Sequence, residues 1–260
     1  MTREQIDGVL RSVIPRPKYL EEIKSQLSSG RMPREEMNQM HSGTTIVAFK
    51  YSEGILFAGD RKTSGGGLSI IALDTKKIHP VSNYSIMGSA GDVGDIQLIT
   101  DALHEVNEAF SDRYGFPIST LGQANFLRNT LRDFYYASQP LWLQTILGGY
   151  SMTGEFEIFE MWQDGGRREV QYTAIGSGTP GAKGILQENR NLINKKLRLE
   201  KAIRLALKAI YRASENDNGS SDLRVATPTI MVVTKNGVRE IDQLRVQKSK
   251  NILVEELRSN

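Results

Sequence analysis

Groups of strand-like segments alternate with pairs of helix-like segments along this chain, and this order limits how it can fold. Residues 44–50 are rich in β-branched side chains, and the turn Ser52-Glu53-Gly54 joins them to a second apolar run over 55–58. This pattern predicts a β-hairpin. Apolar residues at spacings of three and four then predict helices over 96–110 and 124–134.

The second half of the chain repeats the same order. We expect strands near 144–152, 155–162 and 169–175, helices near 181–194 and 198–214, and closing strands near 229–234 and 237–241, followed by a mixed tail. Strand groups that alternate with helix pairs indicate an α+β sandwich, in which helices cover both outer faces of two sheets.

Residues 1–43 differ in character from the rest of the chain. They are polar, carry 7 Lys and Arg against 6 Asp and Glu, and are interrupted by Pro15, Pro17 and Pro33. No strong amphipathic stripe covers them. We therefore divide the 260 residues into a leader, 1–43, and one domain, 44–260.

Composition excludes several kinds of chemistry. The chain has no cysteine, which rules out disulfides, thiolate metal sites and a catalytic Cys, and only 3 histidines. Its 33 Lys and Arg nearly balance 30 Asp and Glu, so the total charge is not that of a nucleic-acid binder. We find no secretory signal and no run of about 20 apolar residues that could span a membrane. The absence of cysteine suits a reducing cytosol.

The boundary Gly43-Thr44 is the first candidate for chemistry. A Thr that begins a strand is ordinarily only a good β former. Cleavage between Gly43 and Thr44 would, however, give Thr44 both a hydroxyl nucleophile and a free α-amine. An α-amine has an ordinary pKa of about 7.7–8.0, so it can act as a general base without a histidine.

Asp60 and a lysine downstream are the second candidate. An Asp after a buried strand is often a turn residue, and Lys76 and Lys77 could both be solvated. In the functional interpretation Asp60 pairs with one of these lysines beneath Thr44, where an ammonium group favours the threonine alkoxide and a neutral amine. We favour Lys77 because the apolar Ile78 follows it.

Three further segments allow both a structural and a functional interpretation. The segment 88–94, GSAGDVG, can be a tight turn or can supply the backbone N–H of Gly88 to an oxyanion. Gly176-Ser177-Gly178 and Asp217-Asn218-Gly219-Ser220 can be turns or a hydrogen-bond network around an amine. Residues 183–208 carry 8 Lys and Arg against 2 Asp and Glu, which indicates a solvated or subunit-contact face.

Together these segments resemble proteasome β-type subunits, which are N-terminal-nucleophile hydrolases, and especially bacterial ones. The matching strings are GTTIVAFKYSEGILFAGDRKTS, TKKI, IMGSAGD, AIGSG and DNGS, in the family's order over most of residues 43–220. The resemblance implies a four-layer α/β/β/α sandwich. The loop between Asp60 and Lys77 is one residue longer than is usual in the family, and without that insertion Lys76 would take the place of the lysine.

The resemblance also implies a role for each matching residue. Thr44 is the nucleophile, exposed by autocatalytic loss of residues 1–43, and Asp60 and Lys77 are the buried acid and lysine. Ser177, Asp217 and Ser220 form the accessory network, and Gly88 is the oxyanion donor. Ser64 pairs with the substrate backbone. Ile86 at the base and Ala90 at the wall of the specificity pocket suggest a hydrophobic preference, and the other residues of that pocket are Thr63, Thr75 and His79.

The resemblance implies a threonine endopeptidase subunit of a cytoplasmic proteasome core particle that degrades unfolded proteins. Its expected partners are other β subunits in a seven-membered ring, α-type subunits and, indirectly, an ATPase ring; no cofactor, nucleic acid or membrane is expected. Three alternatives stay open. They are an uncleaved structural subunit without activity, an acylase of small amides and, least supported, a nucleic-acid binder.

Overall fold

The computed structural model describes residues 43–64, 70–72, 74–151, 153–193, 197–215, 217, 223 and 226–258. The predicted leader lies outside the described residues except for Gly43, and so does Ser220. For Thr63 and Ser64 the structure describes the strand but not the side chains.

The first sheet has five antiparallel strands and carries the start of the predicted domain. The strand order is β10-β1-β2-β11-β12, so the predicted hairpin of β1 and β2 lies in its centre. Its strands are β1 (Ile46–Tyr51), β2 (Gly54–Gly59), β10 (Tyr172–Ile175), β11 (Thr229–Thr234) and β12 (Gly237–Glu240).

The second sheet also has five antiparallel strands, in the order β5-β6-β7-β8-β9. They are β5 (Ile78–Ser82), β6 (Ser85–Gly91), β7 (Leu143–Tyr150), β8 (Phe156–Met161) and β9 (Arg167–Glu169). A separate short pair consists of β3 (Thr63–Ser64) and β4 (Ile70–Ala72).

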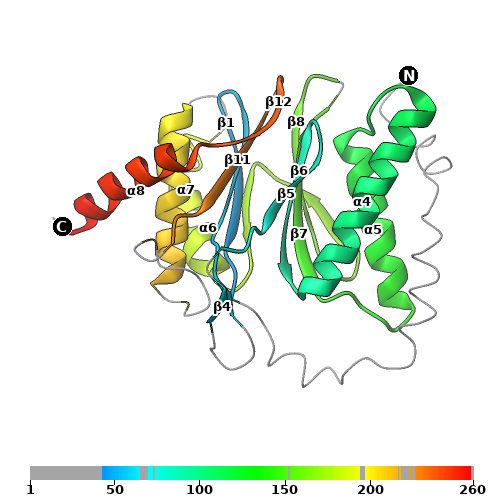
Figure 1. The fold of residues 1–260 in the computed structure, drawn as a ribbon, viewed down its shortest axis with the longest axis horizontal. Helices are drawn as coiled ribbons and strands as arrows, with labels where there is room; N and C mark the ends of the chain where they lie inside the picture. The colour runs from blue at the N-terminus through cyan, green and yellow to red at the C-terminus, as the bar shows by residue number, and fades with distance from the viewer. Residues whose placement is uncertain are drawn as a thin grey trace.

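Helices cover the outer face of each sheet (Figure 1). The helices α4 (Val93–Tyr114) and α5 (Thr120–Tyr136) pack on the second sheet, and α6 (Thr179–Glu188) and α7 (Leu199–Ser214) pack on the first. A third apolar cluster, which includes Ile46, Phe57, Ile86 and Ile146, fills the space between the sheets. The predicted four-layer α/β/β/α sandwich is thus confirmed.

Two elements differ from the sequence prediction. The expected strand over 169–175 is two strands in different sheets, because the chain leaves β9 and crosses to β10 beside β1. The tail forms a helix, α8 (Gln243–Arg258), which begins after Asp242. The Asp242 carboxylate accepts hydrogen bonds from the backbone N–H groups of Leu244 and Arg245, as an N-terminal helix cap does. No helix in the described part of the chain combines the length and the hydropathy needed to cross a membrane.

Candidate active site

Thr44 lies just before β1, at one end of the space between the two sheets. The residue is 3% exposed. Its backbone N–H donates to the Ser177 Oγ at 3.2 Å, and the Ser177 hydroxyl lies 2.6 Å from Asp217 Oδ2, to which it donates. The structure therefore joins three of the predicted residues in a chain of hydrogen bonds that ends on the nitrogen of Thr44.

Gly176 brings the loop that carries Ser177 against Thr44. It has a φ of +92°, a backbone conformation that residues with a side chain rarely adopt. A Cβ atom at this position would lie 2.1 Å from the carbonyl oxygen of Thr44. Only glycine therefore allows the two segments to approach this closely.

Asp60 lies directly after β2, on the other side of Thr44. It is 1% exposed, and its Oδ1 accepts from the backbone N–H of Thr45 at 2.8 Å and from Lys77 Nζ at 2.9 Å. Its Oδ2 accepts from the backbone N–H of Lys62 at 3.2 Å. The Asp60 carboxylate thus connects the segment that carries Thr44 to Lys77 through hydrogen bonds.

The structure separates the two candidate lysines. Lys77 is 7% exposed and forms the buried ion pair with Asp60. Lys76 has a side chain that is 51% exposed, and it pairs with Glu240 at the surface. Lys77 is therefore the lysine that the fold brings to Thr44. Burial lowers the pKa of Lys77 below its ordinary value, against the opposing effect of the Asp60 charge.

The ammonium group of Lys77 also contacts the peptide bond that precedes Thr44. Lys77 Nζ donates to the carbonyl oxygen of Gly43 at 3.0 Å. No hydrogen bond joins Gly88 N to this oxygen within the described residues; Gly88 lies in β6, paired with Ile78 and Ile146. In the uncut chain the donor on this carbonyl is therefore Lys77, and the oxyanion role of Gly88 stays a prediction.

The predicted specificity-pocket residues lie on β5, β6 and the segments before them. Ile86 and Ala90 belong to the cluster between the sheets, and Ile86 is fully buried. His79 is half-buried and pairs in register with Met87. Burial, and then the charge of His104 on α4, lower the pKa of His79. The pocket formed by Thr63, Thr75, His79, Ile86 and Ala90, and the role of Ser64, stay predictions.

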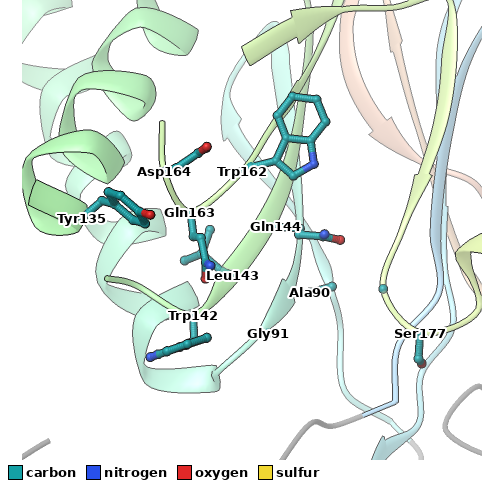
Figure 2. A pocket seen from close by; sticks show the side chains of 11 residues that line it. Ala90, Gly91, Tyr135, Trp142, Leu143, Gln144, Trp162, Gln163, Asp164 and Ser177 are labelled. Atoms are coloured by element: carbon teal, nitrogen blue, oxygen red, sulfur yellow. The ribbon is translucent and has the colours of Figure 1, made fainter. Parts of the chain in front are cut away.

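A cavity of about 590 Å³ opens beside Ser177 and was not foreseen from the sequence. Ser177 and Gly176 line it from the first sheet, and Ala90 and Gly91 line it from β6. Figure 2 shows Gln144 and Trp162 on the same side of Ser177 as Ala90, with Tyr135 and Asp164 farther from Ser177. The chain has only 2 tryptophans, Trp142 and Trp162, and both line this cavity. No motif or periodicity in the sequence places these residues together.

Comparisons with known proteins fit this geometry. The family model described as "Proteasome subunit" matches residues 40–227, which include every residue placed at the site above. The chain belongs to the proteasome subunit family. The match begins close to Gly43-Thr44, so most of the predicted leader lies outside it.

Several curated relatives are β-type subunits of archaea. The chain is 34% identical to "Proteasome subunit beta 1" of Pyrococcus abyssi over 201 residues, covering 76% of this chain and 95% of the relative. It is 29% identical to "Proteasome subunit beta" of Methanopyrus kandleri, covering 82% and 98%. It is 32% identical to "Proteasome subunit beta" of Methanocaldococcus fervens, covering 80% and 89%. The predicted β type is confirmed, and the narrower resemblance to bacterial subunits stays a prediction.

Proposed function

We propose that this chain is a threonine endopeptidase subunit of a proteasome core particle, and that it becomes active when autocatalysis removes residues 1–43. The observation that carries the proposal is the pair of contacts on one peptide bond. Lys77 Nζ holds the oxygen of Gly43, and Ser177 Oγ holds the nitrogen of Thr44. An acyl transfer requires a polarised carbonyl group and a leaving nitrogen that is held in place. These two contacts act on those two groups.

In the proposed processing step, Thr44 Oγ attacks the carbonyl carbon of Gly43. The bond from that carbon to Thr44 N breaks, and the nitrogen takes up the proton that the hydroxyl has lost. The acyl group is then an ester on Thr44 Oγ. Water hydrolyses the ester, which leaves a carboxylate on Gly43 and a free α-amine on Thr44.

Cleavage of a substrate follows the same course with the new amine as base. The amine takes the proton of the Thr44 hydroxyl, Oγ attacks the substrate carbonyl, and the backbone N–H of Gly88 is the expected donor to the oxyanion. The amine then gives its proton to the leaving nitrogen, and water releases the acyl product. The positive charge of Lys77 favours the neutral form of the nearby amine.

The proposal includes the assembly that the family implies. The chain forms seven-membered β rings enclosed by α-type rings in the cytoplasm, and an ATPase ring supplies unfolded proteins. No metal or organic cofactor takes part in the proposed steps. Of the described residues, no group of three or more histidine and carboxylate side chains is arranged to hold a metal ion.

The intact mass of the purified protein, alone and with a candidate α-type partner, tests the proposal. We expect a chain that begins at Thr44 after assembly, and a full-length chain for Thr44→Ala. Thr45→Ser is the matched control, because it changes the adjacent buried threonine and keeps the backbone N–H that Asp60 accepts. A chain that still begins at Met1 in the assembled particle would instead support an uncleaved structural subunit.

A peptide panel tests the predicted specificity. We expect cleavage after hydrophobic residues, because the resemblance to the family puts the apolar residues Ile86 and Ala90 at the base and the wall of the specificity pocket. Cleavage mainly after acidic residues would contradict that expectation. Reaction with small amides but not with peptides would identify an acylase.

A further inference from the structure

We propose that the cavity beside Ser177 binds the substrate on the leaving-group side of the scissile bond and prefers a large aromatic side chain there. The inference rests on the proposed function and adds a substrate class to it. The direction in which a peptide must lie across Thr44 decides which half of the substrate meets the cavity.

The contacts of the Gly43-Thr44 bond set that direction. The acyl carbonyl of this bond lies at Lys77, and its nitrogen lies at Ser177. When an external peptide is cut, its leaving nitrogen must receive a proton from the Thr44 amine and must therefore lie within hydrogen-bond reach of it. The chain that follows the leaving nitrogen consequently continues on the Ser177 side.

The cavity begins at that point. Ser177 and Gly176 form one of its walls, and Gly176 is in contact with the carbonyl group of Thr44. Ala90, two residues after Gly88 in β6, lies on the wall across from Ser177 (Figure 2). Its volume of about 590 Å³ falls in the range of clefts that bury a ligand.

Aromatic side chains give the cavity its chemical character. Tyr135, Trp142 and Trp162 line it, and aromatic rings gain from stacking or edge contacts with one another beyond the burial of apolar area. Asp164 is the one charged residue among the lining residues that the structure describes. Its carboxylate makes the cavity unfavourable for an acidic side chain.

Hydrogen bonds hold the backbone at both tryptophans of the cavity. The Trp142 N–H donates to the Asp95 carboxylate at 2.7 Å, and the Trp142 carbonyl accepts from Asp92 N at 2.8 Å. Trp162 begins a tight turn in which its N–H donates to the carbonyl of Gly166 at 3.0 Å. A preformed aromatic wall binds a side chain at a low cost in conformational entropy.

The test uses the assembled, processed particle and internally quenched peptides with one fixed acyl half. The first three positions after the scissile bond carry phenylalanine, glycine or glutamate in turn. We expect kcat/KM to be about fivefold to tenfold higher for phenylalanine than for glycine in at least one position. We expect Trp162→Ala to remove most of that preference, because kcat/KM on the phenylalanine peptide falls toward the value on the glycine peptide.

Three further variants separate binding from damage to the fold. Tyr84→Ala is the matched control, because Tyr84 is 37% exposed in the turn between β5 and β6 and does not line the cavity, and its preference should equal that of the unaltered particle. Asp164→Asn should raise the rate on glutamate peptides severalfold relative to the rate on phenylalanine peptides. If Trp162→Ala does not assemble, Trp162→Leu takes its place with the same expectation.

The outcomes distinguish the two proposals. An unaltered preference in Trp162→Ala, with peptides still cleaved and Thr44 still exposed, overturns the cavity assignment alone. A particle that cuts none of the peptides and keeps its leader overturns the proposed function. Loss of activity on every peptide in Trp162→Ala, with Trp162→Leu unchanged in preference, also overturns the assignment.

Discussion

The replacement of Asp60 by asparagine measures how much the buried ion pair contributes to the stability of the fold. In Asp60→Asn the amide oxygen can still accept from the Thr45 N–H, but the Lys77 ammonium loses its counter-charge. Breaking one side of a buried pair costs about 3–5 kcal/mol. The experiment is done in a Thr44→Ala background, so that both chains keep the leader and Gly43 O stays available to Lys77.

The cost of leaving the Lys77 ammonium unpaired cannot exceed the free energy needed to deprotonate Lys77, because the lysine can become neutral instead. A lysine of ordinary pKa, about 10.4, needs about 1.36 kcal/mol for each pH unit below that value to lose its proton. The penalty from the unpaired charge is therefore at most about 4.6 kcal/mol at pH 7 and about 1.9 kcal/mol at pH 9. We expect a loss of about 3–4.5 kcal/mol at pH 7 that falls to about 1.9 kcal/mol or less at pH 9.

The sign of the pH dependence follows from proton linkage. Burial already lowers the pKa of Lys77 below that of the unfolded chain, and removal of Asp60 lowers it further. The unfolded state then binds more protons than the folded state in the interval between the two pKa values. The free energy of unfolding consequently rises with pH in that interval, and the interval begins at a lower pH in Asp60→Asn.

Urea unfolding at pH 7 and pH 9 provides the measurement, with Glu240→Gln as the control. Glu240 pairs with the neighbouring Lys76, but that lysine side chain is 51% exposed, so the loss should be below about 1 kcal/mol and equal at both pH values. Equal losses in the two variants, or a loss in Asp60→Asn that does not change with pH, would refute the reasoning.

Three other substitutions have outcomes that follow from the structure. Gly176→Ala should destabilise the chain by about 2 kcal/mol or more and leave it uncut in an intact-mass measurement, because the new Cβ would lie 2.1 Å from Thr44 O; Gly184→Ala, where a Cβ meets nothing within 4 Å, should be tolerated. Glu160→Gln should cost about 1–3 kcal/mol at pH 7. Burial raises the pKa of Glu160, but hydrogen bonds from Arg168 and Thr173 and the charge of Lys183 outweigh burial and lower it. This stabilisation is present above the ordinary pKa and lost on acidification, so urea midpoints of variant and unaltered chain should converge below about pH 4. Tyr51→Phe should be neutral or stabilising by up to about 1 kcal/mol in thermal unfolding, because the buried hydroxyl has no hydrogen-bond partner within the described residues.

Local patterns predicted much of the fold because the forces behind them act over a few residues. The β1–β2 hairpin depends on a turn and two short apolar runs, and α4 depends on one apolar stripe. The helix α8 was missed because only a few of its side chains, Val246 and Leu253 among them, face the core. Its cap at Asp242 was the local signal that could have shown it.

The sequence motifs predicted only part of the site. The order of motifs brought Thr44, Asp60 and Ser177 into one hypothesis, but the choice between Lys76 and Lys77 depends on which side chain turns inward. That follows from the register of β5 against β6 and from the place of Asp60 in the fold. The cavity joins residues near 90, 143, 163 and 177, and no periodicity in a sequence relates segments so far apart.

The uncut chain also indicates how a substrate should lie. Processing and substrate cleavage use the same Thr44 Oγ in our proposal, so the attacked carbonyl must approach that oxygen from the same side in both reactions. Gly43 therefore occupies the place of the acyl residue of a substrate, with its carbonyl oxygen on Lys77 Nζ. In the processing step the leaving nitrogen is that of Thr44, from which the chain continues into β1. An external peptide needs a separate path for its leaving-group half, and the cavity that begins at Ser177 is where the structure provides one.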